Sequence, residues 1–175
     1  MFAQTVYHGT LKSVASVIFS SGFRKSREQD EWLGFGVYFF ECYQDARAWA
    51  MQMMSQRKDK NAGIVISADL KCKDDVDFYD LDIDDNMRKM ETEMQKVLIK
   101  CRHSGAPNIS SKKLRCLACN FYGEKYGIKI FAFSFTAFDY NIIGFPLKTR
   151  KQRQFCVRDI NIIYNVKEAE IDYAI

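Results

Sequence analysis

Apolar and polar positions follow two different periods along this chain, and each period predicts one kind of secondary structure. Segments that are continuously apolar, or apolar at every second residue, predict strands at residues 4–8, 36–40, 63–70, 128–135, 154–157 and 160–166. Apolar positions at intervals of three and four predict helices at residues 11–20, from 44 onward, at 85–102 and from 111 to about 127. Because strands and helices mix without a regular alternation, the pattern predicts the α+β fold class.

Helix ends and helix faces are also indicated by the sequence. Gly22 and Gly127 are placed as C-terminal stops, and Ser110 as an N-terminal cap. The spacing predicts buried helix faces formed by Ala46, Trp49, Ala50 and Met53, by Met87, Met90, Met94, Val97, Leu98 and Cys101, and by Leu114, Leu117, Ala118 and Phe121.

The composition adds that residues 1–175 form one domain. The chain is 47% apolar and 27% charged, has only two prolines, and shows no repeat or linker, as expected of one globular core. No apolar stretch approaches the roughly 20 residues of a membrane helix. The start "MFAQTVYHGT" lacks the basic and apolar regions of a signal peptide, which favours a cytoplasmic protein without membrane contact.

Charge is uneven along the chain. The net charge is +4, residues 74–85 are acidic, and "KTRKQR" at 148–153 holds four cations in six residues. Such a run is most simply a solvated loop, and the alternative is a patch that binds an acidic partner.

Two of the six cysteines have a spacing that zinc sites use. Cys116 and Cys119 have the C-x-x-C spacing of zinc ligands, with Cys101 and His103 as possible partners. Both fall inside a predicted helix, however, and no second paired half is present. We therefore expect no metal, and we interpret all six cysteines as reduced thiols used as small apolar residues.

Two glycine-rich aromatic segments carry the candidate chemistry. "YHGT" at 7–10 closes the first strand, and a glycine beside His8 lets a ligand approach the backbone. "GFGVYFFECYQDARAWA" at 34–50 follows about 25 residues later. Together these segments resemble the ADP-ribosyltransferase superfamily of the diphtheria-toxin and poly(ADP-ribose) polymerase kind. Its first motif is His-Gly-Ser/Thr, and its second is Gly-x-Gly-hydrophobic-Tyr-Phe with another aromatic eleven residues after the tyrosine.

The resemblance implies a split β-sheet with flanking helices and NAD as substrate. It assigns the catalytic positions to His8, Tyr38 and Gln154, the last on the softer third motif at 153–166. It implies NAD binding by His8, Gly9, Thr10, Gly36, Tyr38 and Trp49. In that family the histidine holds an adenosine ribose hydroxyl, the glycine backbone holds the nicotinamide carboxamide, and the tyrosine and second aromatic enclose the nicotinamide ring.

The implied function is mono-ADP-ribosyl transfer of the bacterial toxin or phage-defence type, with a protein or nucleic-acid acceptor and an antitoxin or companion protein as a further partner. The basic run 148–153 would then face the acceptor. Gln154 stands where most members have a glutamate, and losing that charge typically costs about 10²–10³ in rate. Glu41 and Asp159 are candidate replacements. The alternatives are a catalytically degenerate module that binds NAD, ADP-ribose or a partner, and an NAD glycohydrolase.

Overall fold

The computed structural model describes residues 1–57, 62–73, 77–105, 108–136, 140–142, 145–147 and 151–170. Its strands are β1 (Phe2–Leu11), β2 (Val37–Phe40), β3 (Gly63–Cys72), β4 (Phe78–Asp80), β5 (Ile130–Thr136), β6 (Tyr140–Ile142), β7 (Phe145–Leu147), β8 (Lys151–Val157) and β9 (Ile163–Glu168). Its helices are α1 (Lys12–Ser21), α2 (Tyr43–Arg57), α4 (Asp84–His103), α5 (Ser111–Tyr126) and the short 3₁₀ helix η1 (Ile160–Ile162). The predicted α+β class is confirmed.

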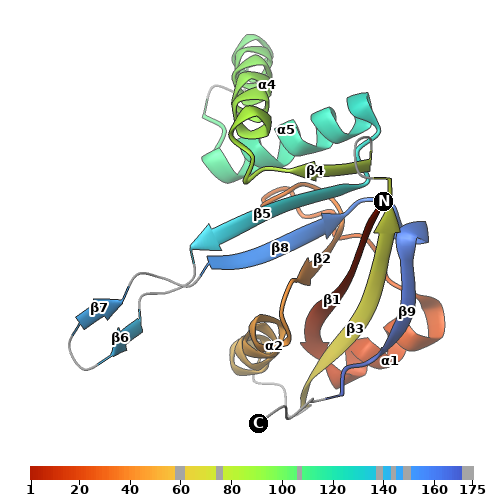
Figure 1. Ribbon diagram of the computed structural model, residues 1–175. Coiled ribbons are helices and arrows are strands. Elements are labelled where there is room, and N and C mark those ends of the chain that lie inside the picture. Colours follow the sequence, from red (N-terminus) through yellow and green to blue (C-terminus); the bar gives the residue numbers. More distant parts are fainter. Residues whose placement is uncertain are drawn as a thin grey trace.

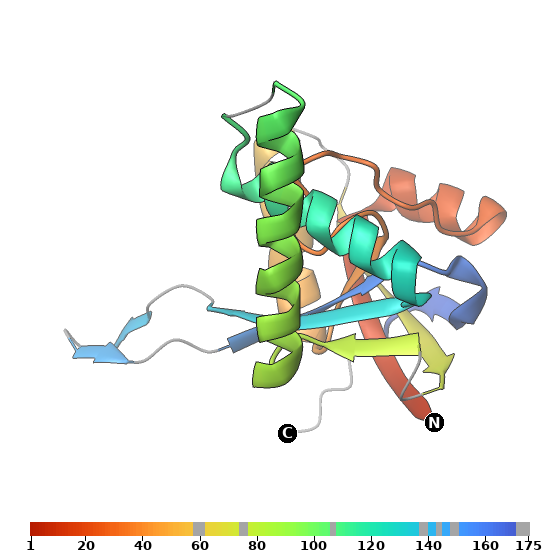
Figure 2. The same cartoon turned by 90° about the horizontal axis from the view of Figure 1, so that it is seen from above.

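Seven strands form one mixed sheet in the order β4-β5-β8-β2-β1-β3-β9, seen in Figure 1. Each pair is antiparallel except β4 and β5, which run parallel. The remaining strands, β6 and β7, pair with each other and project away from the sheet in both Figure 1 and Figure 2.

The helices divide between the two faces of the sheet. Even-numbered residues of β1, such as Val6, pack in one core cluster with Ala15 and Ile18 of α1. Odd-numbered residues face α2 instead, and Tyr7 packs beside Ala46. Side chains alternate along a strand, so α1 and α2 cover opposite faces. On the α2 side, α4 and α5 cover the other end of the sheet and bury Phe131 and Cys156, which form a separate cluster with Met90 and Tyr122.

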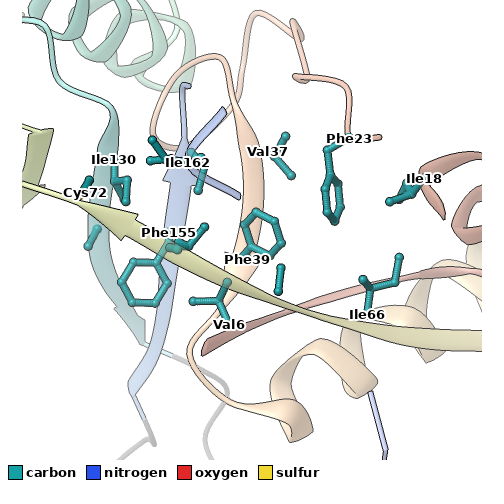
Figure 3. Close-up of a cluster of buried hydrophobic side chains, with 14 of the residues drawn as sticks. Val6, Ile18, Phe23, Val37, Phe39, Ile66, Cys72, Ile130, Phe155 and Ile162 are labelled. Atoms are coloured by element: carbon teal, nitrogen blue, oxygen red, sulfur yellow. The ribbon is translucent and has the colours of Figure 1, made fainter. Parts of the chain in front are cut away.

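The main core lies on the α1 face (Figure 3). Phe39 and Phe155 are fully buried at its centre. Phe23, just after α1, packs against Phe39 with ring centroids 5.1 Å apart. The segment that leaves α1 is thereby fixed against β2, which matters for the cavity described below.

The sheet opens between β1 and β2. β1 pairs with β3 over ten positions, from Phe2↔Cys72 to Leu11↔Gly63. With β2 it pairs at Tyr7↔Phe40 alone, and from His8 onward the two strands no longer pair. β2 instead pairs with β8 along its whole length, from Val37↔Val157 to Phe40↔Gln154. The opening therefore lies beside the residues that follow Tyr7.

The predicted helix ends are confirmed. Gly22 follows α1 with φ 78°, and its N–H donates to the carbonyl of Ile18. Gly127 ends α5 in the left-handed region, and the Ser110 side chain accepts from the N–H of Lys113. No helix among the described residues is long and apolar enough to span a membrane.

Three buried-face predictions were wrong. Trp49 is 46% exposed, because α2 packs so closely through Ala46 and Ala50 that no indole fits beneath it. Leu117 and Phe121 are also exposed, since the buried face of α5 is formed by Cys116, Cys119 and Tyr122. Strand β4 was not predicted, because its two adjacent aromatic residues, Phe78 and Tyr79, lie within the acidic segment; the strand pairs with β5.

Candidate functional site

A cavity of about 380 Å³ lies at the opening between β1 and β2. This volume is within the range of small-molecule pockets. Five residues of the predicted site line it, namely His8, Gly36, Tyr38, Trp49 and Gln154. The other lining residues are Val14, Val17, Ile18, Gly22, Phe23, Arg24, Ser26, Glu31, Trp32, Val37 and Phe40. Residues from both faces of the sheet contribute, so the cavity reaches through the opening rather than lying on one face.

His8 connects the two strands at this opening. Its Nδ1 lies 2.7 Å from the Tyr38 carbonyl oxygen, which only accepts, so Nδ1 carries the proton. The ring packs edge-on against Phe23 and Phe39, with centroids 5.3 and 5.8 Å away. Burial lowers the His8 pKa, which favours the neutral imidazole. Nε2 is then an unprotonated acceptor, suited to a ligand hydroxyl.

We predict that His8 makes stability depend on pH. Its folded-state pKa lies below the unfolded value of 6.5, so the unfolded chain binds more protons as pH falls. The free energy of unfolding should therefore decrease below about pH 6.5, by at most about 1.4 kcal/mol per pH unit from this group. His8→Asn retains a donor for the Tyr38 carbonyl and should flatten the profile. Thermal unfolding between pH 7 and 5 measures this.

The matched control is His103→Asn, because His103 is exposed at the end of α4. This variant should keep the slope of the parent protein. An unchanged slope in His8→Asn would contradict the assignment of the pH dependence to His8.

Tyr38 uses its hydroxyl internally. The hydroxyl donates to the Gly34 carbonyl and accepts from the Leu33 N–H, both at 2.8 Å. Burial raises its pKa, so the phenol stays neutral. The hydroxyl therefore anchors the segment that precedes β2, and only the ring is left to contact a ligand in the cavity.

Gln154 and Trp49 lie on the same face as Tyr38. Gln154 sits between Phe40 of β2 and Phe133 of β5 in the sheet register, and its Nε2 donates to Gln152 Oε1 at 3.1 Å. The Trp49 ring on α2 lies 6.3 Å from that of Phe40. Tyr38, Phe40 and Gln154 thus line the cavity from the sheet, and Trp49 lines it from the adjacent helix.

Gly9 and Thr10 do not line the cavity, and Thr10 is buried. A Cβ on Gly9 would lie 1.9 Å from the Ala46 carbonyl oxygen of α2. Gly36 likewise lacks room, since its Cβ would lie 2.5 Å from Cys156 Sγ. Both glycines are therefore explained by backbone packing, although Gly36 also borders the cavity.

The backbone of Gly9 nevertheless faces the opening. Gly9 is opposite Val65 of β3, whose carbonyl accepts from Ala169 on the far side of β3. The N–H and C=O of one residue in an antiparallel strand point to the same side, so Val65 directs both toward β9. Gly9 must then direct its own N–H and C=O away from β3, toward the place where β2 separates.

Among the eleven lining residues outside the predicted site are Arg24, Glu31 and Trp32, which lie on the segment between α1 and β2. Arg24 and Glu31 are the two ends of the charged segment "RKSREQDE". Arg24 is exposed and follows Phe23, whose burial fixes the segment. Trp32 is 42% exposed, and the Arg115 guanidinium lies 3.9 Å from its ring centroid. No periodicity marks such a loop, so only its charged ends could have suggested a role.

The other predicted residues lie elsewhere. Glu41 accepts from Gln4 and lies 3.8 Å from Arg153, and Asp159 caps η1; neither lines the cavity. Arg153 of the basic run pairs with Asp80 at 2.7 Å and with Asp82. Residues 148–150 are outside the described residues.

The six cysteines, all within the described residues, form no disulfide, and Cys72, Cys116, Cys119 and Cys156 are buried. Burial raises the pKa of Cys119 to about 12, so this thiol stays protonated. Within the described part of the chain, no three His, Cys, Asp or Glu side chains form a metal-binding group.

Comparison of the chain with protein-family models, with curated proteins and with solved structures gives no match.

Proposed function

We propose that this protein is an NAD-dependent mono-ADP-ribosyltransferase that transfers one ADP-ribose to a protein or nucleic acid. The observation that carries the proposal is the cavity at the β1–β2 opening, where His8, Tyr38, Trp49 and Gln154 converge from four separate elements. These are the residues that the resemblance to the superfamily selects. The separation of β1 from β2 also supports the split sheet that the resemblance implies.

Each group suits one part of a bent NAD molecule. The ring of Tyr38 and the exposed ring of Trp49 offer aromatic faces to the cationic nicotinamide. The unprotonated Nε2 of His8 suits a hydrogen bond donated by a ribose hydroxyl. The N–H and C=O of Gly9 match the acceptor and donor of the carboxamide. Arg24 carries the one guanidinium group among the described residues that line the cavity, and this group suits the pyrophosphate of NAD.

One observation favours a second candidate function, an NAD-binding module without chemistry. Gln154 lies in the cavity where the transferases of this superfamily mostly have glutamate, and an amide holds a hydroxyl without supplying charge. A third candidate, NAD glycohydrolase, differs from the first only in using water as the acceptor.

The positive charge of the segment around residues 148–153 suggests the class of acceptor. Lys151 is exposed at the start of β8, next to residues 148–150, whereas Arg153 is held by Asp80 and Asp82. An acidic protein or a nucleic acid suits such a cationic segment. A companion antitoxin would suit a protein that modifies components of its own cell.

An incubation with NAD, combined with a thermal-unfolding measurement in the presence of NAD, separates the three candidate functions. The protein is incubated with NAD and a cell lysate, and nicotinamide, free ADP-ribose, protein and nucleic acid are analysed by mass. Transferase activity predicts nicotinamide release with ADP-ribose on an acceptor. Glycohydrolase activity predicts free ADP-ribose. A binding module predicts thermal protection by NAD with no nicotinamide, and the absence of both binding and release contradicts the proposal.

A further inference from the structure

We propose that Glu31 supplies the negative charge that stabilises the positively charged ribose intermediate. Most members of the superfamily have a glutamate for this role at the position that Gln154 occupies here. This inference rests on the proposed function and names a further catalytic residue for it. Among the described residues that line the cavity, Glu31 is the one carboxylate. The candidates from sequence, Glu41 and Asp159, are engaged elsewhere and lie outside the lining.

The position of Glu31 is fixed by a short chain of contacts. The Ser26 hydroxyl donates to the Glu31 carboxylate, and Ser26 also lines the cavity. The Ser26 N–H donates to the Gly36 carbonyl at 2.8 Å, which ties this loop to the segment leading into β2. On the other side, Trp32 is held between Arg115 and Phe135, whose ring lies 5.0 Å away. The carboxylate is therefore held by Ser26, and the neighbouring Trp32 is fixed by its own contacts, which favours a preorganised charge for electrostatic stabilisation.

The electrostatic surroundings fit this role. Burial is the main cause that raises the Glu31 pKa, the Ser26 hydrogen bond opposes it, and Asp30 and Glu28 add to it. Burial is the main cause that raises the pKa of the Tyr38 hydroxyl, and the Glu31 charge adds to it, which is consistent with Glu31 lying near Tyr38. Partial removal from water strengthens the attraction between a carboxylate and a nearby positive charge.

The step that Glu31 would assist balances without another reactant. The bond between ribose C1′ and the nicotinamide nitrogen breaks, and its electron pair leaves with neutral nicotinamide. C1′ becomes cationic while the Glu31 carboxylate faces it. A lone pair of the acceptor then forms the new bond to C1′, and the proton of the acceptor passes to solvent. No oxidant, reductant or metal is needed.

The test compares Glu31→Gln with the parent protein. The amide oxygen of glutamine still accepts from Ser26, so the loop should stay in place. Nicotinamide release from saturating NAD should fall about 10²–10³-fold, the usual loss for one preorganised group at a transition state. The rise in melting temperature with NAD should stay as in the parent protein, since binding is retained. Glu28→Gln, exposed in the same loop, is the control and should keep full turnover.

The outcomes separate this inference from the proposed function. If the parent protein turns over NAD and Glu31→Gln keeps its rate, Glu31 is not the charge and the transferase assignment stands. If the parent protein binds NAD but releases no nicotinamide, the catalytic role is also refuted. Failure of the parent protein to bind or consume NAD refutes the proposed function itself. Should Glu31→Gln not fold, Ser26→Ala tests the same idea, because releasing the carboxylate should lower turnover while NAD protection persists.

Discussion

Tyr38→Ala is expected to weaken NAD binding about 5- to 150-fold. Stacking of one base on an aromatic side chain is worth about 1–3 kcal/mol, and each 1.4 kcal/mol is tenfold in affinity. The Tyr38 ring lines the cavity, whereas its hydroxyl is already bonded to Gly34 and Leu33. The loss should therefore come from the ring, and it is measured as the NAD concentration that gives half of the maximal thermal shift.

Tyr38→Phe separates the ring from the hydroxyl. It keeps the aromatic face and should bind NAD nearly as the parent protein does. It removes the partner of the Gly34 carbonyl and of the Leu33 N–H, at a cost of about 2 kcal/mol. For a chain of this size, the melting temperature should fall by roughly 4–8 °C.

The control for both variants is Tyr164→Ala, since Tyr164 is 46% exposed on β9 and outside the cavity. Equal loss of NAD affinity in Tyr38→Phe and Tyr38→Ala would contradict stacking as the role of the ring. It would indicate that the anchored segment before β2 shapes the site instead.

The secondary structure was predictable where local chemistry decides it. Gly22 and Gly127 end helices in conformations that glycine adopts without strain, and Ser110 caps α5 as its side chain allows. The exposure of the Trp49 side chain was not predictable in this way. Helical spacing indicates which positions share a face, but the closeness of α2 to the sheet is set by Gly9 of β1 and Gly63 of β3.

The candidate site was predictable only in part. His8 and Tyr38 belong to short motifs, and the sheet brings them together across the opening. Gln154 joins them because β8 pairs with β2, a long-range pairing that the strand pattern alone does not specify. Glu31 reaches the cavity through the bridge between Ser26 and Gly36, and no sequence period encodes the path of that loop.

Gly9→Ala is expected to lower the free energy of unfolding by at least about 3 kcal/mol. The new methyl group would meet the Ala46 carbonyl oxygen at 1.9 Å, and that oxygen belongs to the backbone of α2. Overpacking commonly costs about 1–3 kcal/mol where side chains adjust, and here a whole helix must move. The melting temperature should fall by roughly 6–12 °C, as followed by circular dichroism.

Gly105→Ala is the matched control, because Gly105 has φ 83° but nothing within 4 Å of its absent Cβ. The free energy of unfolding of Gly105→Ala should fall only by about 1–2 kcal/mol, the strain of a side chain in the left-handed region.

The stability of Gly9→Ala also decides how a loss of NAD binding in this variant is interpreted. Since α2 carries Trp49, moving this helix would disturb the cavity even if no ligand contacts Gly9. Only a Gly9→Ala protein that melts like the parent protein yet fails to bind NAD would assign the glycine to ligand contact rather than to packing.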